Sequence, residues 1–153
     1  MVAVIGDIHG CFYTLKQLVE KIRNKYSDIK IFCVGDLVDR GNYSYEVIEF
    51  VLSEQISFTP GNHDLMFYYF FNDPDSQMGK TWSFNGSEST IRSYENRMDK
   101  LDAHLNAIIS APIFILNNDC FISHAGISRT FKNKINSAVI TDEMKLKKIL
   151  SED

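Results

Sequence analysis

Short runs of apolar and β-branched residues alternate along the first half of the chain with longer segments in which apolar positions recur every three or four residues. The short runs at 2–5, 29–34 and 56–59 predict buried strands. The longer segments at 12–26 and 43–52 predict amphipathic helices between these strands. This alternation indicates an α/β domain in which helices cover a sheet.

The middle of the chain departs from this regular pattern. A helix that is apolar on nearly all sides is expected over 65–71, and the Gly, Asn, Asp and Ser residues of 72–89 predict turns. Two further helices are expected over 88–96 and 100–110, the second with Asp99 as its N-cap. The strand–helix alternation therefore gives way to a mainly helical region.

The last part of the chain predicts a β-hairpin and a final helix. The strands are expected at 113–116 and 120–123, joined by the turn residues 117–119. The final helix is expected over 141–150. Because no repeat, low-complexity tract or linker interrupts the sequence, one domain is expected over 1–153.

Composition excludes several classes of protein. The 153 residues carry a net charge of −4, which gives no basic surface for a nucleic acid polymer. The sequence has no run of about 18 apolar residues, the length needed to span a bilayer, and no basic leader before an apolar stretch. A cytoplasmic protein that does not bind membranes is therefore expected. The three cysteines form no C-x-x-C pair, and we expect Cys11, Cys33 and Cys120 to fill the core.

Residues that can bind metal or phosphate follow four of the predicted strands. Ligands of open α/β sheets bind beyond the carboxyl ends of the strands, so these segments are expected to meet at one rim. The four segments are Gly-Asp-Ile-His-Gly (6–10), Gly-Asp-Leu-Val-Asp-Arg-Gly (35–41), Gly-Asn-His-Asp (61–64) and Ser-His-Ala-Gly (123–126).

The candidate metal ligands are oxygen and imidazole groups with no thiolate. They are Asp7, His9, Asp36, Asn62 and His124. This donor set suits two divalent ions, with Mn²⁺ expected first and Fe or Zn²⁺ as alternatives. Asp36 has two carboxylate oxygens and could bridge the ions. A pair of ions can activate water and bind the attacking and leaving oxygens of a displacement at phosphorus.

The remaining polar residues of these segments predict the other parts of a phosphoryl-transfer site. Arg40 is expected to bind phosphate oxygens through its planar guanidinium, and Asn62 is also expected to bind phosphate. His63 is expected to act as a general acid that protonates the leaving oxygen. Asp39 would keep the His63 imidazole oriented.

Each segment alone also has a simpler structural explanation. Asp7 and His9 could belong to a surface turn, Asn62 could cap a helix, and His124 could satisfy backbone carbonyls. The segment 35–41 is harder to explain structurally, because an Asp-Arg pair flanked by glycines contributes little to a core. Four such segments in order, each after a strand, favour a functional site.

Other conspicuous residues are given structural roles. The aromatic run 67–71 is expected to serve a core or an interface rather than base stacking, because consecutive helical positions point in different directions. His104 is expected on a polar helix face, and Cys11 is expected to pack at a helix start.

Taken together, the four segments resemble those of the calcineurin-like metallophosphoesterases, and within them the phosphoprotein phosphatase branch. The resemblance covers residues 6–128. It implies a layered β-sandwich flanked by helices. The segment that includes Trp82, 85–87 and 90–94 also resembles an Asn-Gly-Gly-x-x-Thr segment of small bacterial and phage members.

The resemblance also implies a role for each candidate residue. Asp7, His9 and Asp36 would hold the first metal. Asp36, Asn62 and His124 would hold the second. His63 with Asp39 would be the acid pair and Arg40 a phosphate ligand.

The function expected from these features is hydrolysis of phosphomonoesters, as a serine/threonine or broad-specificity protein phosphatase. One alternative is a symmetrical dinucleoside tetraphosphate hydrolase, which performs the same chemistry on a small phosphoester. The other is a non-catalytic metal-binding module with an incomplete site. Neither the physiological substrate nor the oligomeric state follows from the sequence.

The C-terminal part departs from the family pattern. Family members continue with a Trp-x-Arg segment and a Gly-His-Thr segment, whereas no histidine follows His124 here. We therefore expect an incomplete second sheet and a chain truncated at its C-terminus. The alternatives are completion by a partner subunit and a degenerate enzyme that still binds metal.

Overall fold

The first half of the protein contains a three-stranded parallel sheet. The computed structural model describes residues 1–117 and 120–126. The strands are β1 (Val2–Ile5), β2 (Lys30–Cys33) and β3 (Ser57–Phe58), hydrogen-bonded in the order β1-β2-β3. All three predicted strands are thus confirmed, although β3 is shorter than expected.

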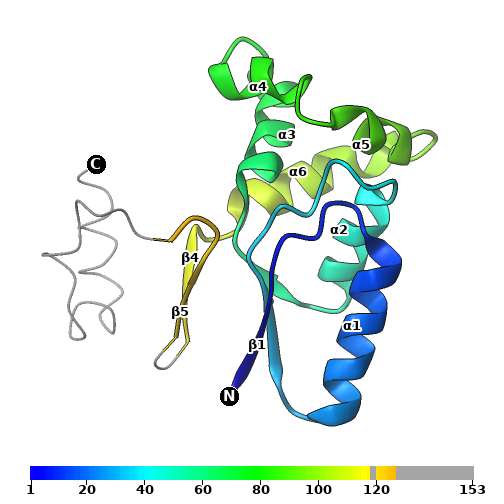
Figure 1. Cartoon of the computed structure of the whole chain (residues 1–153). Coiled ribbons are helices and arrows are strands. Elements are labelled where there is room, and N and C mark those ends of the chain that lie inside the picture. The colour runs from blue at the N-terminus through cyan, green and yellow to red at the C-terminus, as the bar shows by residue number, and fades with distance from the viewer. Residues whose placement is uncertain (118–119, 127–153) are drawn as a thin grey trace, which may run out of the picture.

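Two helices connect the strands of this sheet. Helix α1 (Phe12–Lys25) leads from β1 to β2, and α2 (Ser44–Ser53) leads from β2 to β3. Parallel neighbours need such crossover connections, and the register pairs Ile5 with Cys33. Figure 1 shows both helices on the same side of the sheet. Since both loops that leave β1 and β2 emerge at one end of the sheet, they bring their polar residues to the same place.

The core lies between this sheet and its two helices. The helices bury the apolar side chains that their sequence spacing places on one face: Leu15, Val19, Val47, Ile48 and Val51. Burying a side chain of this size stabilises the fold by about 1.5–3 kcal/mol.

A layer of helices lies beyond the end of the sheet (Figure 1). Its elements are α3 (Asn62–Asn72), α4 (Gln77–Trp82), α5 (Ser87–Ser93), the 3₁₀ turn η1 (Met98–Lys100) and α6 (Leu101–Ser110). Trp82, Tyr94 and Phe67 are buried in this layer, and the rings of Phe67 and Trp82 have centroids 5.2 Å apart. The layer therefore has an aromatic core that continues the apolar core of the sheet.

Two local predictions for this layer were wrong. Helix α4 occupies part of the segment expected to form turns, and its N-cap Ser76 accepts a hydrogen bond from the backbone N–H of Gly79 at 3.1 Å. Asp99 does not cap α6, because η1 precedes that helix and Lys100 occupies the N-cap position. In both cases a short helical turn formed where composition had indicated an irregular segment or a helix boundary.

The expected hairpin strands are present as a small second sheet. Strands β4 (Phe114–Asn117) and β5 (Cys120–Ser123) pair antiparallel, with Phe114 opposite Ser123. The expected turn residues 118–119 and the expected helix over 141–150 lie outside the described residues. The predicted α/β class and the small second sheet are confirmed.

Three side-chain predictions need correction or completion. His104 is buried, with 1% of its surface exposed, and does not lie on a polar face. Cys11 is exposed instead of packed, whereas Cys33 is buried as expected. In the aromatic run, Phe67 belongs to the core but Phe71 is 40% exposed.

Among the helices of the described part, none has both the length and the apolar character needed to cross a bilayer.

Candidate metal centre

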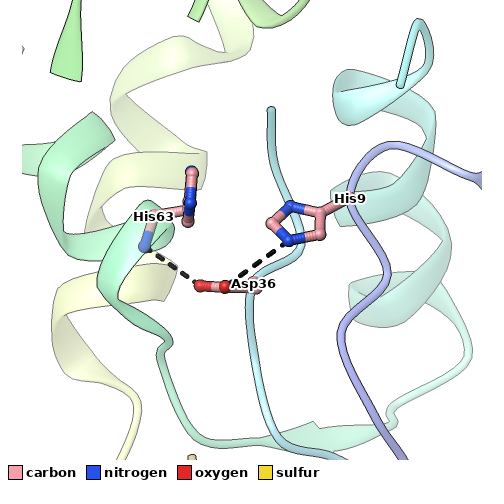
Figure 2. A group of neighbouring side chains, drawn as sticks. All are labelled: His9, Asp36 and His63. Atoms are coloured by element: carbon pink, nitrogen blue, oxygen red, sulfur yellow. Dashed lines mark hydrogen bonds and ion pairs between the residues drawn. The ribbon is translucent and has the colours of Figure 1, made fainter. Parts of the chain in front are cut away.

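Polar residues that follow separate strands converge beyond the end of the sheet. Asp7 follows β1, Asp36 follows β2 and His124 follows β5. Ligand atoms of these three side chains all lie within 4.8 Å of one another. A second group, His9, Asp36 and His63, meets the same limit. Figure 2 shows His9 and His63 on opposite sides of the Asp36 carboxylate.

The grouping of these residues differs from the one that the resemblance implies. Asp7 shares its group with His124 rather than with His9, and His63 joins the group of His9. Asp36 is common to both groups and is only 4% exposed. A buried carboxylate with one oxygen for each group is what a bridging ligand requires.

Two histidines present the same ring nitrogen to this carboxylate. The Nδ1–H group of His9 donates to the carbonyl of Val38 at 2.9 Å, and that of His124 donates to the carbonyl of Val34 at 2.7 Å. Because a carbonyl can only accept, Nδ1 is the protonated nitrogen of the neutral ring, and Nε2 of that tautomer has the lone pair that a metal ligand requires. Nε2 of His9 lies 3.6 Å from Asp36 Oδ2, and Nε2 of His124 lies 3.8 Å from Asp36 Oδ1.

Asn62 adds another oxygen to the side of the site formed by His124. Its Oδ1 atom lies 3.2 Å from Nε2 of His124. In this orientation two lone pairs point toward each other, an arrangement that a cation bound between them would stabilise. With this contact, all five predicted metal ligands lie in or beside the two groups.

The loop that carries Asp36 fits closely against the start of α3. A Cβ atom on Gly61 would overlap the Asp36 carboxylate, and one on Gly35, whose φ is +89°, would overlap the backbone of Gly61. The backbone N–H of His63 donates to Asp36 Oδ1 at 3.0 Å. Glycine at these two positions therefore lets the motif segments approach closely enough to share one carboxylate.

His63 and Asp39 form a buried hydrogen-bonded pair. Nδ1 of His63 donates to Asp39 Oδ2 at 2.7 Å, and Asp39 is completely buried. The opposite nitrogen, Nε2, faces Arg40 Nη2 at 3.3 Å. Arg40 also places Nη1 2.8 Å from Nε2 of His9. The guanidinium therefore extends across the mouth of the site, between the two histidines.

Four of the candidate residues have an unusual backbone conformation. The φ angles are +45° for His9, +48° for Asp36, +71° for Asp39 and +68° for Arg40. Residues other than glycine seldom adopt positive φ, and such conformations concentrate at functional sites. The two motif loops therefore store backbone strain at the positions whose side chains converge.

Asp64, the last residue of the third segment, holds the surrounding loops together. Its Oδ1 accepts the backbone N–H of Leu37 at 2.8 Å, and its Oδ2 accepts that of Gly61 at 2.9 Å. Burial raises the pKa of this carboxyl to about 7, against the opposing effect of the backbone donors. Asp64 thus links the loop after β2 to the N-terminus of α3, although sequence reasoning gave it no role.

Two more residues contact the site although their motif was noticed only by resemblance. Trp82 and Thr90 both donate hydrogen bonds to the carboxylate of Asp39. They lie 43 and 51 positions from Asp39, so no local spacing marks the contact.

The residues fit a pair of hard or borderline divalent ions. The convergent groups are carboxylate and carboxamide oxygens and imidazole nitrogens, and the two groups of ligands share one carboxylate. Mn²⁺, Fe and Zn²⁺ all accept such donors. A metal on Nε2 of His9 would take the lone pair that now faces Arg40, whose exposed side chain can turn toward a bound anion.

Comparison with known proteins agrees with this geometry. A family model described as calcineurin-like phosphoesterase matches residues 1–152. A bis(5'-nucleosyl)-tetraphosphatase PrpE, named asymmetrical, from Anoxybacillus flavithermus is 31% identical over 155 residues, which cover 89% of this chain and 61% of that protein. The chain thus spans about three-fifths of the length of the curated relatives it matches.

Two solved structures share the fold. One is a proposed diadenosine tetraphosphatase, with a TM-score of 0.59 and 22% identity over 82% of this chain and 50% of that one. The other is a protein serine/threonine phosphatase from Saccharomyces cerevisiae, with a TM-score of 0.56 and 22% identity over 83% of this chain and 38% of that one.

Proposed function

The chain belongs to the calcineurin-like phosphoesterase family, whose members use a dimetal centre, and we propose that it hydrolyses phosphoric esters with two divalent ions held by Asp7, His9, Asp36, Asn62 and His124. The observation that carries the proposal is the position of Asp36. One buried carboxylate serves both groups of ligands, with Nε2 of His9 facing one of its oxygens and Nε2 of His124 facing the other. Mn²⁺ is the proposed ion, with Fe and Zn²⁺ as alternatives.

The ions would supply Lewis acidity and an activated water molecule at the phosphorus atom. Arg40 binds the non-bridging oxygens of the phosphoryl group, because its guanidinium already lies over both histidines at the mouth of the site. Asn62 contributes a second polar contact to the phosphoryl group from the start of α3. These contacts orient the ester so that its leaving oxygen faces His63.

His63 acts as the general acid. Asp39 accepts a hydrogen bond from Nδ1–H of His63, which leaves Nε2 as the nitrogen directed into the site. A protonated Nε2 donates its proton to the leaving oxygen as the bond to phosphorus breaks. The Asp39 carboxylate stabilises the positive charge on the ring before transfer and fixes the ring plane.

The proposed substrates are phosphomonoesters of protein side chains, as in a serine/threonine or broad-specificity protein phosphatase. A dinucleoside tetraphosphate is the second candidate, and the names of the curated relatives favour it. Symmetrical cleavage of diadenosine tetraphosphate would give two ADP molecules, and asymmetrical cleavage would give ATP and AMP. The products therefore distinguish this candidate from a phosphatase and the two cleavage modes from each other.

The test compares p-nitrophenyl phosphate, a phosphoserine peptide and diadenosine tetraphosphate, each with Mn²⁺ and with a chelator. Mn²⁺-dependent release of phosphate from the first two supports the phosphatase, whereas turnover of the dinucleotide alone supports the second candidate. A chain that binds two ions but hydrolyses none of the three substrates would be a non-catalytic metal-binding module, and the proposal would be wrong.

Two variants separate metal binding from proton transfer. Asp36→Asn should lose bound metal, because it removes charge from the ligand common to both groups. His63→Asn should keep both ions and lower kcat by about 10²–10⁴-fold, the usual contribution of a general acid. Metal content measured by mass spectrometry after dialysis checks the contrast, and equal metal loss in both variants would contradict the assignment.

A further inference from the structure

The carboxylate of Asp39 is fully buried beside the site. Asp39 has no exposed surface, and His63, its partner in the acid pair, is only 4% exposed. A charge buried in this way is costly unless hydrogen-bond donors surround it. The donors that Asp39 uses come from separate elements of the helical layer.

Three side chains donate to this carboxylate and together fix its rotation. His63 Nδ1 donates to Oδ2 at 2.7 Å, and Thr90 Oγ1 donates to Oδ1 at 2.8 Å. Nε1 of Trp82 lies 2.9 Å from Oδ2 and 3.1 Å from Oδ1, so its single N–H points at the edge between the two oxygens. With both oxygens and the edge between them engaged, the carboxylate has no alternative rotation that keeps these bonds.

Thr90 holds the backbone of Asp39 as well as its side chain. The backbone N–H of Asp39 donates to Thr90 Oγ1 at 2.8 Å and to Ser44 Oγ at 3.2 Å. Since the Thr90 proton goes to Asp39, the hydroxyl of Ser44 donates to Thr90 at 3.0 Å. Each hydroxyl proton in this buried chain therefore has a defined acceptor, and the chain supports Asp39 in its strained conformation, with φ at +71°.

The distribution of these donors argues for a role in orienting His63. Trp82 ends α4 and Thr90 lies in α5, whereas His63 lies in α3. The Asp39 carboxylate is the point at which three helices meet. A shift of α4 or α5 would therefore turn the carboxylate and, through it, the imidazole ring.

We propose that Trp82 and Thr90 are positioning residues that hold the Asp39 carboxylate so that it directs Nε2 of His63 at the leaving oxygen. The inference rests on the proposed function, because it assigns these residues to the proton-transfer step of that reaction. Neither residue touches the metal ligands or the phosphoryl group, so their effect on turnover passes through the orientation of His63.

Two aryl phosphates that differ only in a nitro group test the proposal. Phenolate is a much stronger base than p-nitrophenolate, so phenyl phosphate depends on proton donation far more than p-nitrophenyl phosphate does. Trp82→Phe and Thr90→Val should lower kcat for phenyl phosphate about tenfold or more while changing kcat for p-nitrophenyl phosphate less than about threefold. The KM values and the metal content should stay at those of the wild type.

The chain offers matched controls for these variants. Thr90→Ser keeps the hydroxyl and should restore the wild-type ratio of the two rates. Tyr94→Phe removes a buried aromatic hydroxyl from the same layer without contacting Asp39, and should leave the ratio unchanged. In a His63→Asn background, adding Trp82→Phe should cause no further loss on phenyl phosphate, because the two changes affect one step.

A second measurement tests the contact independently of activity. The sequence contains one tryptophan, so the protein has a single indole N–H signal in an NMR spectrum. That proton should exchange slowly with solvent, and Asp39→Asn should move its signal, whereas Tyr94→Phe should move it much less. Retention of the wild-type signal in Asp39→Asn would overturn the geometry.

The outcomes separate the two proposals. If the wild-type protein hydrolyses none of the tested esters, including both aryl phosphates, the proposed function is wrong, and so is this inference. An active wild type whose Trp82 and Thr90 variants lose both aryl phosphates equally, or lose metal, would overturn the positioning role alone.

Discussion

Replacing Tyr94 by phenylalanine removes one oxygen atom from the aromatic core of the layer of helices. Tyr94 is 2% exposed and His104 is 1% exposed. The hydroxyl of Tyr94 donates to Nδ1 of His104 at 2.7 Å, and Nε2 of His104 donates to Glu49 at 2.7 Å. These bonds link the C-cap residue of α5 to α6 and α2, so the substitution breaks a hydrogen-bonded chain between three helices.

The expected cost follows from what the missing hydroxyl leaves behind. Nδ1 of His104 becomes a buried acceptor without its donor, and a buried polar group that loses its partner costs about 1–3 kcal/mol. The ring of Tyr94 stays, so no cavity larger than one oxygen atom adds to this. For a chain of this length each 1 kcal/mol lowers Tm by about 2–4 °C, which predicts a Tm about 2–12 °C lower in Tyr94→Phe.

Thermal and urea unfolding followed by circular dichroism measure this difference. Tyr13→Phe is the matched control, because Tyr13 is 59% exposed, and it should change the free energy of unfolding by less than about 0.5 kcal/mol. A Tyr94→Phe variant as stable as the wild type would show that the Tyr94–His104 bond is not formed as described.

Three other outcomes follow from the structure. Burial lowers the pKa of His104, so the unfolded chain takes up a proton more readily than the folded chain does. The free energy of unfolding should therefore fall as the pH drops below 6.5. His104→Gln should make the midpoint of urea unfolding less dependent on pH in this range. Gly61→Ala places a methyl group against Asp36, and calorimetry should find Mn²⁺ binding at least about tenfold weaker. Burial, together with the charge of Asp64, raises the pKa of the Cys33 thiol to about 12, whereas Cys11 is exposed. Iodoacetamide at pH 8 should therefore label Cys11 and leave Cys33 unmodified, which peptide mass spectrometry would measure.

The parts of the site that sequence predicted are those in which local pattern and sheet topology act together. Asp7 and Asp36 directly follow apolar strands, and parallel strands present their carboxyl ends at one edge. The convergence of these side chains therefore required only that the strands pair in parallel, which the intervening helices indicated. His9 and His63 could be assigned to the site because each lies within two residues of a predicted ligand.

The parts that sequence did not predict depend on contacts between helices. His104 is a polar residue between Ala103 and Leu105, and the hydrogen-bond partner that accompanies its burial, Glu49, is 55 positions away. Helix α4 has a glycine in its interior and follows a turn-rich segment, so its stability comes from packing against α3 rather than from propensity. The donors of Trp82 and Thr90 to Asp39 were missed for the same reason, because no periodicity connects residues on separate short helices.

The positive φ angles are concentrated in the two loops that carry predicted site residues. Four of the six residues other than glycine with positive φ in the described part of the chain are the predicted site residues His9, Asp36, Asp39 and Arg40. Glycine would adopt these angles at lower cost, so each side chain is retained at about 1–3 kcal/mol of strain. Backbone hydrogen bonds between the two loops offset part of this cost: the N–H of His9 donates to the carbonyl of Asp36 at 2.7 Å, and the N–H of Gly41 donates to the carbonyl of His9 at 3.0 Å. Keeping ionisable side chains at four strained positions costs local stability, which is expected where these side chains serve a reaction. The two adjoining loops hold the strained positions because the backbone of each donates a hydrogen bond to the backbone of the other.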